Sequence, residues 1–373
     1  MAVPIGLACV DRILGEACWS HQGVERIASF HDATHREGAV QRLVSIVVLV
    51  LVVGAGWKFL QDGSSGGSGS DTGSPPGLFA PASKVVASGG SPPVAWTGSP
   101  TVRIASFNIQ VFGRAKEQNV AAMQTLAAII RNFDVIAVQE IRIKDDFLLQ
   151  RFLSTYLNPL SGRSYDYVLG PRLGRSSSKE QYAFIYDTNR VEVDRNHTYT
   201  VRDPDDLLHR EPFVAMFRVR GPPPGEAFTF VLVNIHTDPD EVDTELNDLA
   251  KVCRAVRVAA LSEDDIILLG DFNVDGQHMG ELGRIPGLRP LISEVFTNTR
   301  QTALYDNVLI HHPSTAEFVG RAGVYDILRL HNLKLSEALQ VSDHMPVWAE
   351  FSIYESVKPG RVASNPEVAT GQK

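Results

Sequence analysis

The chain has 373 residues, which exceeds one average domain, and it carries a formal net charge of −8 at pH 7. With 44% hydrophobic and 21% charged residues its composition is globular, which excludes wholesale disorder and a collagen-like chain. The negative charge argues against a histone-like protein held to nucleic acid by bulk charge, although a local basic groove is compatible with it. The cysteine count is 3, which excludes a disulfide scaffold and a Cys-ligated zinc site.

An apolar segment lies near the amino end of the chain. Residues 43–60 begin with LVSIVVLVLVV and carry no charge before Lys58. This length is at the short end for a membrane span and close to the apolar core of a signal peptide. Arg36 and Arg42 precede the segment, a distribution that predicts a cytoplasmic amino end and an exported remainder. Residues 1–42 are therefore interpreted as a tail and residues 43–60 as a transmembrane or signal-anchor segment, with a secreted protein if the segment is cleaved.

Two stretches without core-forming residues bound the part of the chain that can fold. Residues 61–100 are first Gly/Ser-rich and then Pro-rich, which is typical of a flexible and then stiffer linker. Residues 355–373 are again loop-like and are interpreted as a C-terminal tail. Residues 101–354 are long enough for a single layered core.

Within residues 101–354, short apolar runs alternate with turn signals. Apolar runs predict strands, and apolar residues at helical spacing predict two helices, over residues 120–130 and 241–259. The many strands and few helices predict an α+β fold with mixed sheets and helices packed outside. The predicted strands cover residues 102–107, 135–138, 182–186, 214–219, 228–233, 266–269, 304–310 and 345–351.

Polar residues repeatedly stand just beyond the ends of these apolar runs. A rigid sheet delivers side chains at its strand ends to one crevice, so the repetition predicts an active site. A single Asn or Asp in such a position would be a turn residue, but this many together favour a catalytic constellation. The residues are Asn108, Glu140, Arg142, His236, Asp271, Asn273, Asp306, Asp343 and His344.

The residue types in this set indicate the chemistry. One Glu with Asn and Asp oxygens, and no Cys, suits a hard cation such as Mg²⁺, Mn²⁺ or Ca²⁺ better than zinc. Two histidines suit general acid–base transfer near neutral pH, and a carboxylate on the far imidazole nitrogen would fix the tautomer of each. We expect Glu180 to pair with His236 and Asp306 to pair with His344.

Three arginines complete the expected chemistry, because Arg142, Arg175 and Arg210 can supply bidentate donors for phosphate oxygens. A divalent cation, two histidines and several arginines together predict phosphate-ester hydrolysis by in-line attack of water. The sequence offers no covalent nucleophile, since Ser342 in the SDH tripeptide is interpreted as a turn residue.

Eight motifs cover nearly the whole of this region, from about Arg103 to Phe351. In chain order they read RIASFNIQVFG, VIAVQEIR, LGRSSSKEQYAFIYD, HREPFVAMF, VNIHTDPDEVDTEL, ILLGDFNVD, ALYDNVLI and SDHMPVWAEF. The set resembles the endonuclease/exonuclease/phosphatase superfamily, and LGRSSSKEQY and HREP look like its deoxyribonuclease I branch. The resemblance implies a DNase I-like four-layer α/β sandwich, in which helices flank two packed mixed β-sheets.

The resemblance also implies a role for each candidate residue. The metal-site residues would be Asn108, Glu140 and Asp343, and the implied cofactor is Mg²⁺ or Mn²⁺, with Ca²⁺ left open. His236 with Glu180 and His344 with Asp306 would form the acid–base dyads. Asp271 and Asn273 would hold the scissile phosphate and the attacking water, and DNA would be contacted by Arg142, Arg175 and Arg210.

Three features depart from the family pattern. Ser178 stands where the family has an aromatic residue that packs into the DNA minor groove. The family's two disulfides are absent, since no Cys follows Asp275 or directly precedes Asp306. The family's loop for structural calcium is matched only in part, by Thr297, Asn298, Thr299 and Thr302.

The leading prediction is a membrane-tethered or exported, divalent-metal-dependent endonuclease that hydrolyses DNA phosphodiester bonds with little sequence specificity. The alternative is a phosphoesterase of the same fold that acts on a phospholipid or other small phosphoester. Membrane anchoring favours this alternative, whereas the three arginines favour DNA. A catalytically silent binding module is disfavoured, because every acid, base and metal position holds a competent residue. The predicted partners are DNA and, through the N-terminal segment, a membrane; no protein partner is evident.

Overall fold

The computed structural model describes residues 99–145, 147–160, 162–175, 179–260 and 263–356. These residues belong to the second of two units into which the chain divides, Gly67–Lys373. Several predictions concern residues outside this described part. They are the tail over 1–42, the apolar anchor over 43–60, nearly all of the linker and of the C-terminal tail, and Ser178. No helix in the described part of the chain is long and apolar enough to cross a membrane.

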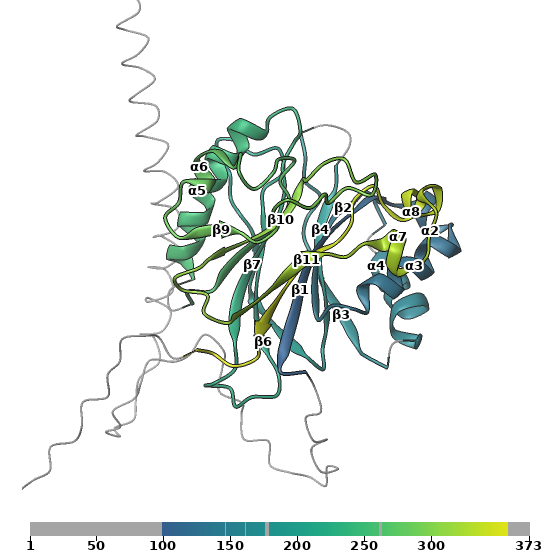
Figure 1. Ribbon diagram of the computed structural model, residues 1–373, viewed down its shortest axis with the longest axis horizontal. Coiled ribbons are helices and arrows are strands. Elements are labelled where there is room, and N and C mark those ends of the chain that lie inside the picture. Colours follow the sequence, from purple (N-terminus) through teal and green to yellow (C-terminus); the bar gives the residue numbers. More distant parts are fainter. Residues whose placement is uncertain (1–98, 146, 161, 176–178, 261–262, 357–373) are drawn as a thin grey trace, which may run out of the picture. The chain divides into compact units, whose positions relative to one another are not determined.

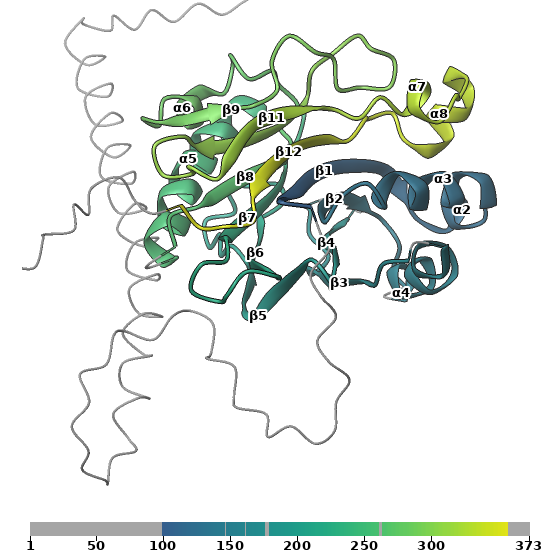
Figure 2. The same ribbon diagram turned by 60° about the horizontal axis from the view of Figure 1, so that its bottom comes forward.

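The first of two sheets contains, among the described residues, six strands in the order β11-β12-β1-β2-β4-β3. Strands β1 and β2 run parallel, and the other neighbouring pairs are antiparallel. Figure 2 shows these strands in succession from the top of the view downward. Their bounds are Thr101–Phe112 for β1, Val135–Ile141 for β2, Tyr165–Leu169 for β3, Gln181–Asp187 for β4, Phe318–Val324 for β11 and Val347–Ser352 for β12.

The second sheet also has six strands in the described part, in the order β5-β6-β7-β8-β10-β9. Strands β7 and β8 run parallel, and their neighbours are antiparallel to them. Each sheet is therefore mixed, with one parallel pair near its middle. The bounds are Val191–Thr200 for β5, Phe213–Val219 for β6, Thr229–His236 for β7, Ile266–Asp271 for β8, Leu288–Pro290 for β9 and Asp306–His311 for β10.

Helices cover the outer face of each sheet, so the order of layers is helices, sheet, sheet, helices (Figure 1). Apolar residues of α3, α4 and α8 pack on the first sheet, and those of α5 and α6 pack on the second. The prediction of two packed mixed sheets flanked by helices is confirmed. The helices are α2 (Arg114–Glu117), α3 (Val120–Ile130), α4 (Leu148–Phe152), α5 (Val242–Ala259), α6 (Gly280–Gly283), α7 (Ile327–Leu330) and α8 (Leu335–Val341), and a π-turn (Leu153–Leu157) and a 3₁₀ turn (Asn158–Leu160) follow α4.

The core between the sheets is rich in aromatic rings. Phe217 of the second sheet stacks on Phe230 with centroids 5.7 Å apart and meets Phe184 of the first sheet edge-on at 5.6 Å. Phe228 likewise packs on Phe351 across the two sheets at 5.7 Å. Because alternate residues of a strand face opposite sides, the central strands bury one set here and the other beneath the helices, which explains their continuous apolar runs.

The predicted helix over 120–130 is confirmed, and the one over 241–259 begins one residue later, at Val242. All eight predicted strands are present, with shifted ends. Strands β3, β5, β9 and β11 were not predicted, because β5 is partly exposed and polar, β11 is partly exposed and interrupted by two glycines, β3 is interrupted by an Asp and β9 is very short. Such strands lack the continuous apolar run by which buried strands are recognised.

Four candidate site residues lie in strands rather than beyond their ends, which corrects the sequence-based expectation. His236 and Asp271 are the last residues of β7 and β8. Asn108 belongs to β1 and Glu140 to β2, because both strands continue through irregular segments. Glu140 has a φ of 61°, and in β1 Gln110 and Val111 have φ values of 38° and 49°. Such angles are uncommon for residues other than glycine and are held in place by surrounding contacts.

Candidate active site

The site residues come together at one end of the two packed sheets. His236 is the last residue of β7, Asp271 is the last of β8, and Asp306 is the first of β10. The strand register places Asp271 opposite both His236 and Asp306. His344 lies in the turn before β12, beside this edge. The carboxyl ends of a parallel pair thus deliver two of the predicted catalytic groups side by side.

The first predicted dyad is present. Nδ1 of His236 lies 2.6 Å from Oε1 of Glu180, and both side chains are buried. Burial opposes charge on the imidazole, but the carboxylates of Glu180 and Asp271 outweigh it and raise the pKa of His236. Burial alone would raise the pKa of Glu180, yet the positive charges of His236 and Arg210 hold it below its ordinary value. The pair therefore favours the charged form of both groups.

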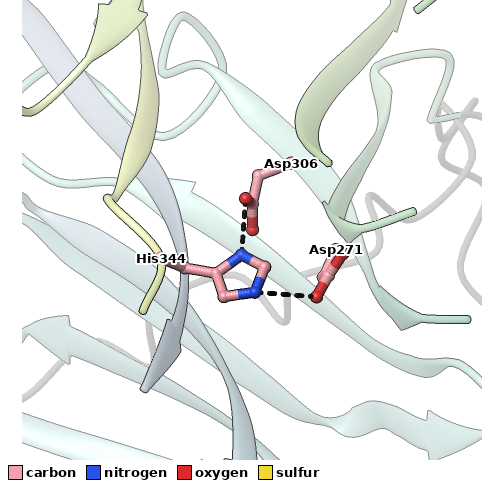
Figure 3. Close-up of side chains that lie close together, drawn as sticks. All are labelled: Asp271, Asp306 and His344. Atoms are coloured by element: carbon pink, nitrogen blue, oxygen red, sulfur yellow. Dashed lines mark hydrogen bonds and ion pairs between the residues drawn. The ribbon is translucent and has the colours of Figure 1, made fainter. Parts of the chain in front are cut away.

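The second predicted dyad is also present. Nδ1 of His344 lies 2.8 Å from Oδ2 of Asp306, and Asp306 is fully buried. Figure 3 shows the imidazole lying between Asp306 on one side and Asp271 on the other. Although burial opposes it, the negative charge of Asp306 and Asp271 raises the pKa of His344 well above its ordinary value.

Both dyads converge on a single carboxylate oxygen. Oδ2 of Asp271 lies 3.6 Å from Nε2 of His236 and 3.6 Å from Nε2 of His344. The same oxygen accepts a hydrogen bond of 3.0 Å from the amide of Asn108, and the other oxygen accepts one from the backbone N–H of Asn273. The two imidazole nitrogens that are not held by a dyad carboxylate therefore face a common point.

The three residues predicted for the metal lie next to this point. The amide nitrogen of Asn108 is 3.3 Å from Oε1 of Glu140, and burial together with Glu140 and Asp271 raises the pKa of Asp343. The carboxylate oxygens of Glu140 and Asp343, with the amide of Asn108 beside them, fit a hard divalent cation. As placed, Asn108 directs its nitrogen toward the carboxylates, while its oxygen accepts from the backbone N–H of Gln110. The carboxylates of Glu140 and Asp343 are therefore the stronger candidates for ligands.

Two residues near the metal candidates were missed by sequence reasoning. The ammonium of Lys116 donates to the carbonyls of Gln110 and Val341 at 2.6 Å each, and burial lowers its pKa to about 8. The amide of Gln110 donates to Oδ2 of Asp343 at 2.8 Å. Lys116 therefore holds the irregular part of β1 against the turn that carries Asp343. Neither residue follows an apolar run, so the strand-end signal could not find them.

The three predicted phosphate-binding arginines differ in their surroundings. Arg142 lies between the dyad and the metal candidates, with Nε 3.2 Å from Glu140 and Nη2 3.5 Å from Glu180. Arg210 is buried and donates to the carbonyls of His236 and Thr237 at the end of β7. This geometry supports the backbone beside His236, and the buried guanidinium also lies 3.6 Å from the carboxylate of Glu180.

Arg175 is not brought to the dyads by its contacts. It is exposed, and its ion pairs within the described residues are with Asp206 at 3.1 Å and Glu241 at 2.7 Å. These pairs join the segment before Glu180 to the start of α5. Direct contact of Arg142, Arg175 and Arg210 with a phosphate stays a prediction.

The remaining predicted positions form a hydrogen-bonded frame around the dyads. Asn273, with a φ of 53°, donates through its side chain to the carbonyl of Thr237 at 2.9 Å. The hydroxyl of Ser342 donates to the carbonyl of Asn108 and accepts from the N–H of His344, which is the structural role expected of a turn residue.

Cys253 is buried as a free thiol.

The residues that partly echo a calcium loop also belong to this frame. The hydroxyl of Thr299 donates to the carbonyls of Ser342 and His344. The hydroxyl of Thr297 accepts from the N–H of Asp306 at 3.1 Å, and Asn298 closes a turn with Thr302. These side chains therefore position the second dyad.

Comparison with known proteins identifies the family to which the chain belongs. The model of the Endonuclease/Exonuclease/phosphatase family matches residues 105–344. Deoxyribonuclease gamma of Rattus norvegicus is 34% identical over 275 residues, covering 69% of this chain and 86% of that protein. Deoxyribonuclease-1-like 1 of Homo sapiens is 32% identical over 275 residues, covering 70% and 89%. A solved family protein of Bacteroides thetaiotaomicron is 15% identical with a TM-score of 0.47, covering 69% of this chain and 98% of that one.

Proposed function

Because the chain belongs to the endonuclease/exonuclease/phosphatase family and to its deoxyribonuclease I-like branch, we propose that it is a divalent-metal-dependent endonuclease that hydrolyses DNA phosphodiester bonds with little sequence specificity. The observation that carries the proposal is the convergence of two histidine–carboxylate dyads on Oδ2 of Asp271. The relatives at 32–34% identity that bear the name deoxyribonuclease support DNA as the substrate.

The dyads are suited to proton transfer at both ends of a scissile bond. The carboxylates of Glu180 and Asp306 fix the imidazoles from behind, so that Nε2 of each ring is the atom that takes or gives a proton. In-line hydrolysis needs one group that accepts a proton from water and one that donates a proton to the leaving oxygen. Two imidazoles that both face one oxygen of Asp271 can supply both groups.

Glu140 and Asp343, with Asn108, would hold the divalent cation. When bound, such a cation polarises the phosphoryl oxygens and offsets the charge that develops on them. Lys116 and Gln110 position these residues by fixing the irregular part of β1 against the turn before His344. Asp271, through its contacts with Asn108 and Asn273, holds the frame on which the phosphate and the attacking water would sit.

Contact with DNA would depend on local positive charge, because the chain as a whole carries −8. Arg142 lies 3.5 Å from Glu180 of the first dyad, and Arg175 is exposed. We propose that these two guanidinium groups bind the DNA phosphates that flank the cleaved phosphate. Arg210 instead stabilises the end of β7 by donating to the carbonyl of His236.

Residues 43–60 are proposed to anchor the chain in a membrane, with the catalytic region outside the cytoplasm, or to direct secretion if they are cleaved. The support is their uncharged apolar composition and the two arginines that precede them. A reporter fused after Pro100 should be active outside the cytoplasm. A reporter that is active only in the cytoplasm would reject export.

The nuclease proposal is tested with the full-length chain and supercoiled plasmid in Mg²⁺, Mn²⁺ or EDTA. We expect metal-dependent nicking that falls about a hundredfold or more in His236→Ala and in His344→Ala, since acid–base groups contribute factors of this size. His197→Ala is the matched control, because His197 is also held by a carboxylate, Asp194 at 2.6 Å, but lies on the edge strand β5.

A parallel assay offers vesicles that contain phosphoinositide or sphingomyelin under the same conditions. Release of the lipid phosphate headgroup while the plasmid stays intact would reject the nuclease proposal and favour the phospholipid alternative. Plasmid nicking that is unchanged in both histidine variants would reject the dyads as the acid–base groups.

A further inference from the structure

A second group of carboxylates lies at the end of the second sheet that is remote from the dyads. Asp265 directly precedes β8, whose last residue is Asp271, so the two are about 20 Å apart at a strand rise of 3.3 Å per residue. Glu263 lies beside it, Glu317 directly precedes β11, and Glu355 follows β12. One oxygen each of Asp265, Glu317 and Glu355 lie within 4.8 Å of one another.

Hydrogen bonds hold several of these carboxylates in place. Glu317 accepts from the backbone N–H of Ser356 at 2.6 Å, and Glu355 accepts from the N–H of Thr229 at 3.1 Å. Glu263 accepts from the N–H of Asp265 at 2.8 Å and from the hydroxyl of Thr229. The group therefore joins the starts of β7 and β8 to the segments that flank β11 and β12.

Two of the carboxylates nevertheless have an oxygen that meets no hydrogen-bond donor at full hydrogen-bonding geometry, although the hydroxyl of Thr315 lies beside Asp265. Asp265 and Glu317 are 1% and 2% exposed, and Oδ1 of Asp265 and Oε2 of Glu317 are buried without a hydrogen-bond partner. Within the described residues, neither side chain forms an ion pair with Lys, Arg or His. A buried carboxylate oxygen without a donor or a cation is costly, and a cation bound by these oxygens would remove that cost.

The donor chemistry identifies the class of cation. Among the described residues, no Cys or His belongs to this group, which lacks the sulfur and imidazole ligands that zinc and copper prefer. Calcium binds oxygens at about 2.3–2.6 Å, so two ligands of one ion are at most about 5 Å apart, and the spacing within 4.8 Å meets that limit. Two of the three carboxylates are buried and Glu355 is partly exposed, and such a set of charged oxygens is the kind of site that calcium prefers.

We propose that Asp265, Glu317 and Glu355 form a structural site for Ca²⁺, separate from the catalytic centre, which links the segment after β12 to the starts of β8 and β11. The backbone already joins the segment after β12 to the start of β7, since the N–H of Phe228 donates to the carbonyl of Ile353 and that of Glu355 donates to the carbonyl of Glu226. Bound calcium would add a charged link at the same place and stabilise the native state.

The test compares two full-length proteins after treatment with EDTA and its removal. Both carry Glu140→Gln, which removes a ligand candidate of the catalytic cation, and one also carries Asp265→Asn and Glu317→Gln. Calorimetric titration with Ca²⁺ should find one more bound ion in the first protein than in the second. A hundredfold excess of Ca²⁺ over its dissociation constant should raise the Tm of the first protein by about 5 °C and leave that of the second unchanged.

The substituted amides keep the size of the carboxylates and remove their repulsion, so we expect the second protein to fold in EDTA. If it does not, Glu355→Gln replaces the pair, because its amide oxygen can still accept from Thr229. The matched control carries Asp205→Asn and Glu294→Gln, which remove the same charges from exposed positions and should keep the extra ion. Equal calcium binding and equal Tm shifts in the proteins with and without the cluster substitutions would overturn the proposal.

Discussion

At the scale of single residues, the site is organised around the two oxygens of Asp271. One oxygen faces Nε2 of His236 and Nε2 of His344, and the other is held by the backbone of Asn273. Each imidazole is held from behind by its own carboxylate, at 2.6 Å for Glu180 and 2.8 Å for Asp306. Because one carboxylate stabilises positive charge on both rings, a change in the protonation of either ring alters the protonation of the other.

The Glu180→Gln variant should lower the pKa of His236, because the carboxylate that most stabilises the imidazolium is lost. The measurement is a pH titration of the imidazole signals by NMR, with His197 as the internal reference. An unchanged pKa of His236 would contradict the pairing as the cause of its raised value.

The same variant should lose stability in a defined pH window. The raised pKa of His236 contributes stability that is fully present below its ordinary value of 6.5 and is lost as pH rises through the raised value. The lowered pKa of Glu180 contributes stability that is present above its ordinary value of 4.5. Urea unfolding should therefore show the largest difference from the wild type between about pH 4.5 and 6.5, and a smaller one at pH 9.

At the scale of elements, the parallel pair β7 and β8 determines where His236 and Asp271 lie. Gly270 and Ile235 are register partners in this pair, one residue before the two catalytic candidates. A Cβ at position 270, where φ is 155°, would lie 1.8 Å from the carbonyl oxygen of Ile235. The two strands can therefore approach as they do only with glycine at this position.

The Gly270→Ala variant should lose about 3 kcal/mol or more of the free energy of unfolding, because β8 must move away from β7. Urea unfolding measures this loss, and nicking should fall with it as Asp271 shifts from His236. Gly225→Ala is the control, since a Cβ there meets no atom within 4 Å. Equal stability of the two variants would contradict the close approach of the strands.

At the scale of the whole molecule, each dyad is assembled from both sheets. Glu180 directly precedes β4 of the first sheet, whereas His236 ends β7 of the second. His344 lies in the turn before β12 of the first sheet, whereas Asp306 begins β10 of the second. The aromatic core that holds the sheets together therefore also determines the geometry of the dyads.

The Phe217→Ala variant should lose about 3–5 kcal/mol of the free energy of unfolding, because the fully buried ring packs against Phe184 and Phe230. Phe217→Leu retains much of the apolar volume and should lose less. Urea unfolding compares the two variants. A Phe217→Ala protein as stable as the wild type would show that this ring does not hold the sheets together.

Much of this arrangement could be predicted from local sequence. The helix over 120–130 and the buried strands follow from apolar patterning, because a buried segment must present apolar residues at the period of its backbone. The list of candidate residues follows from polar side chains next to those runs. Asn108 and Glu140 were placed beyond their strands only because local patterning does not report irregular segments with positive φ.

The sequence by itself determined which residue types are available and, through its motifs, the family to which the chain belongs. Only the tertiary structure decided which of them meet. Glu180 and His236 are separated by 56 residues and Asp306 and His344 by 38, and each pair bridges two sheets. The tertiary structure also buried Arg210 against the end of β7. It brought Asp265, Glu317 and Glu355 together at the end of the second sheet that is remote from the dyads. These contacts depend on how the sheets pack, which no local period encodes.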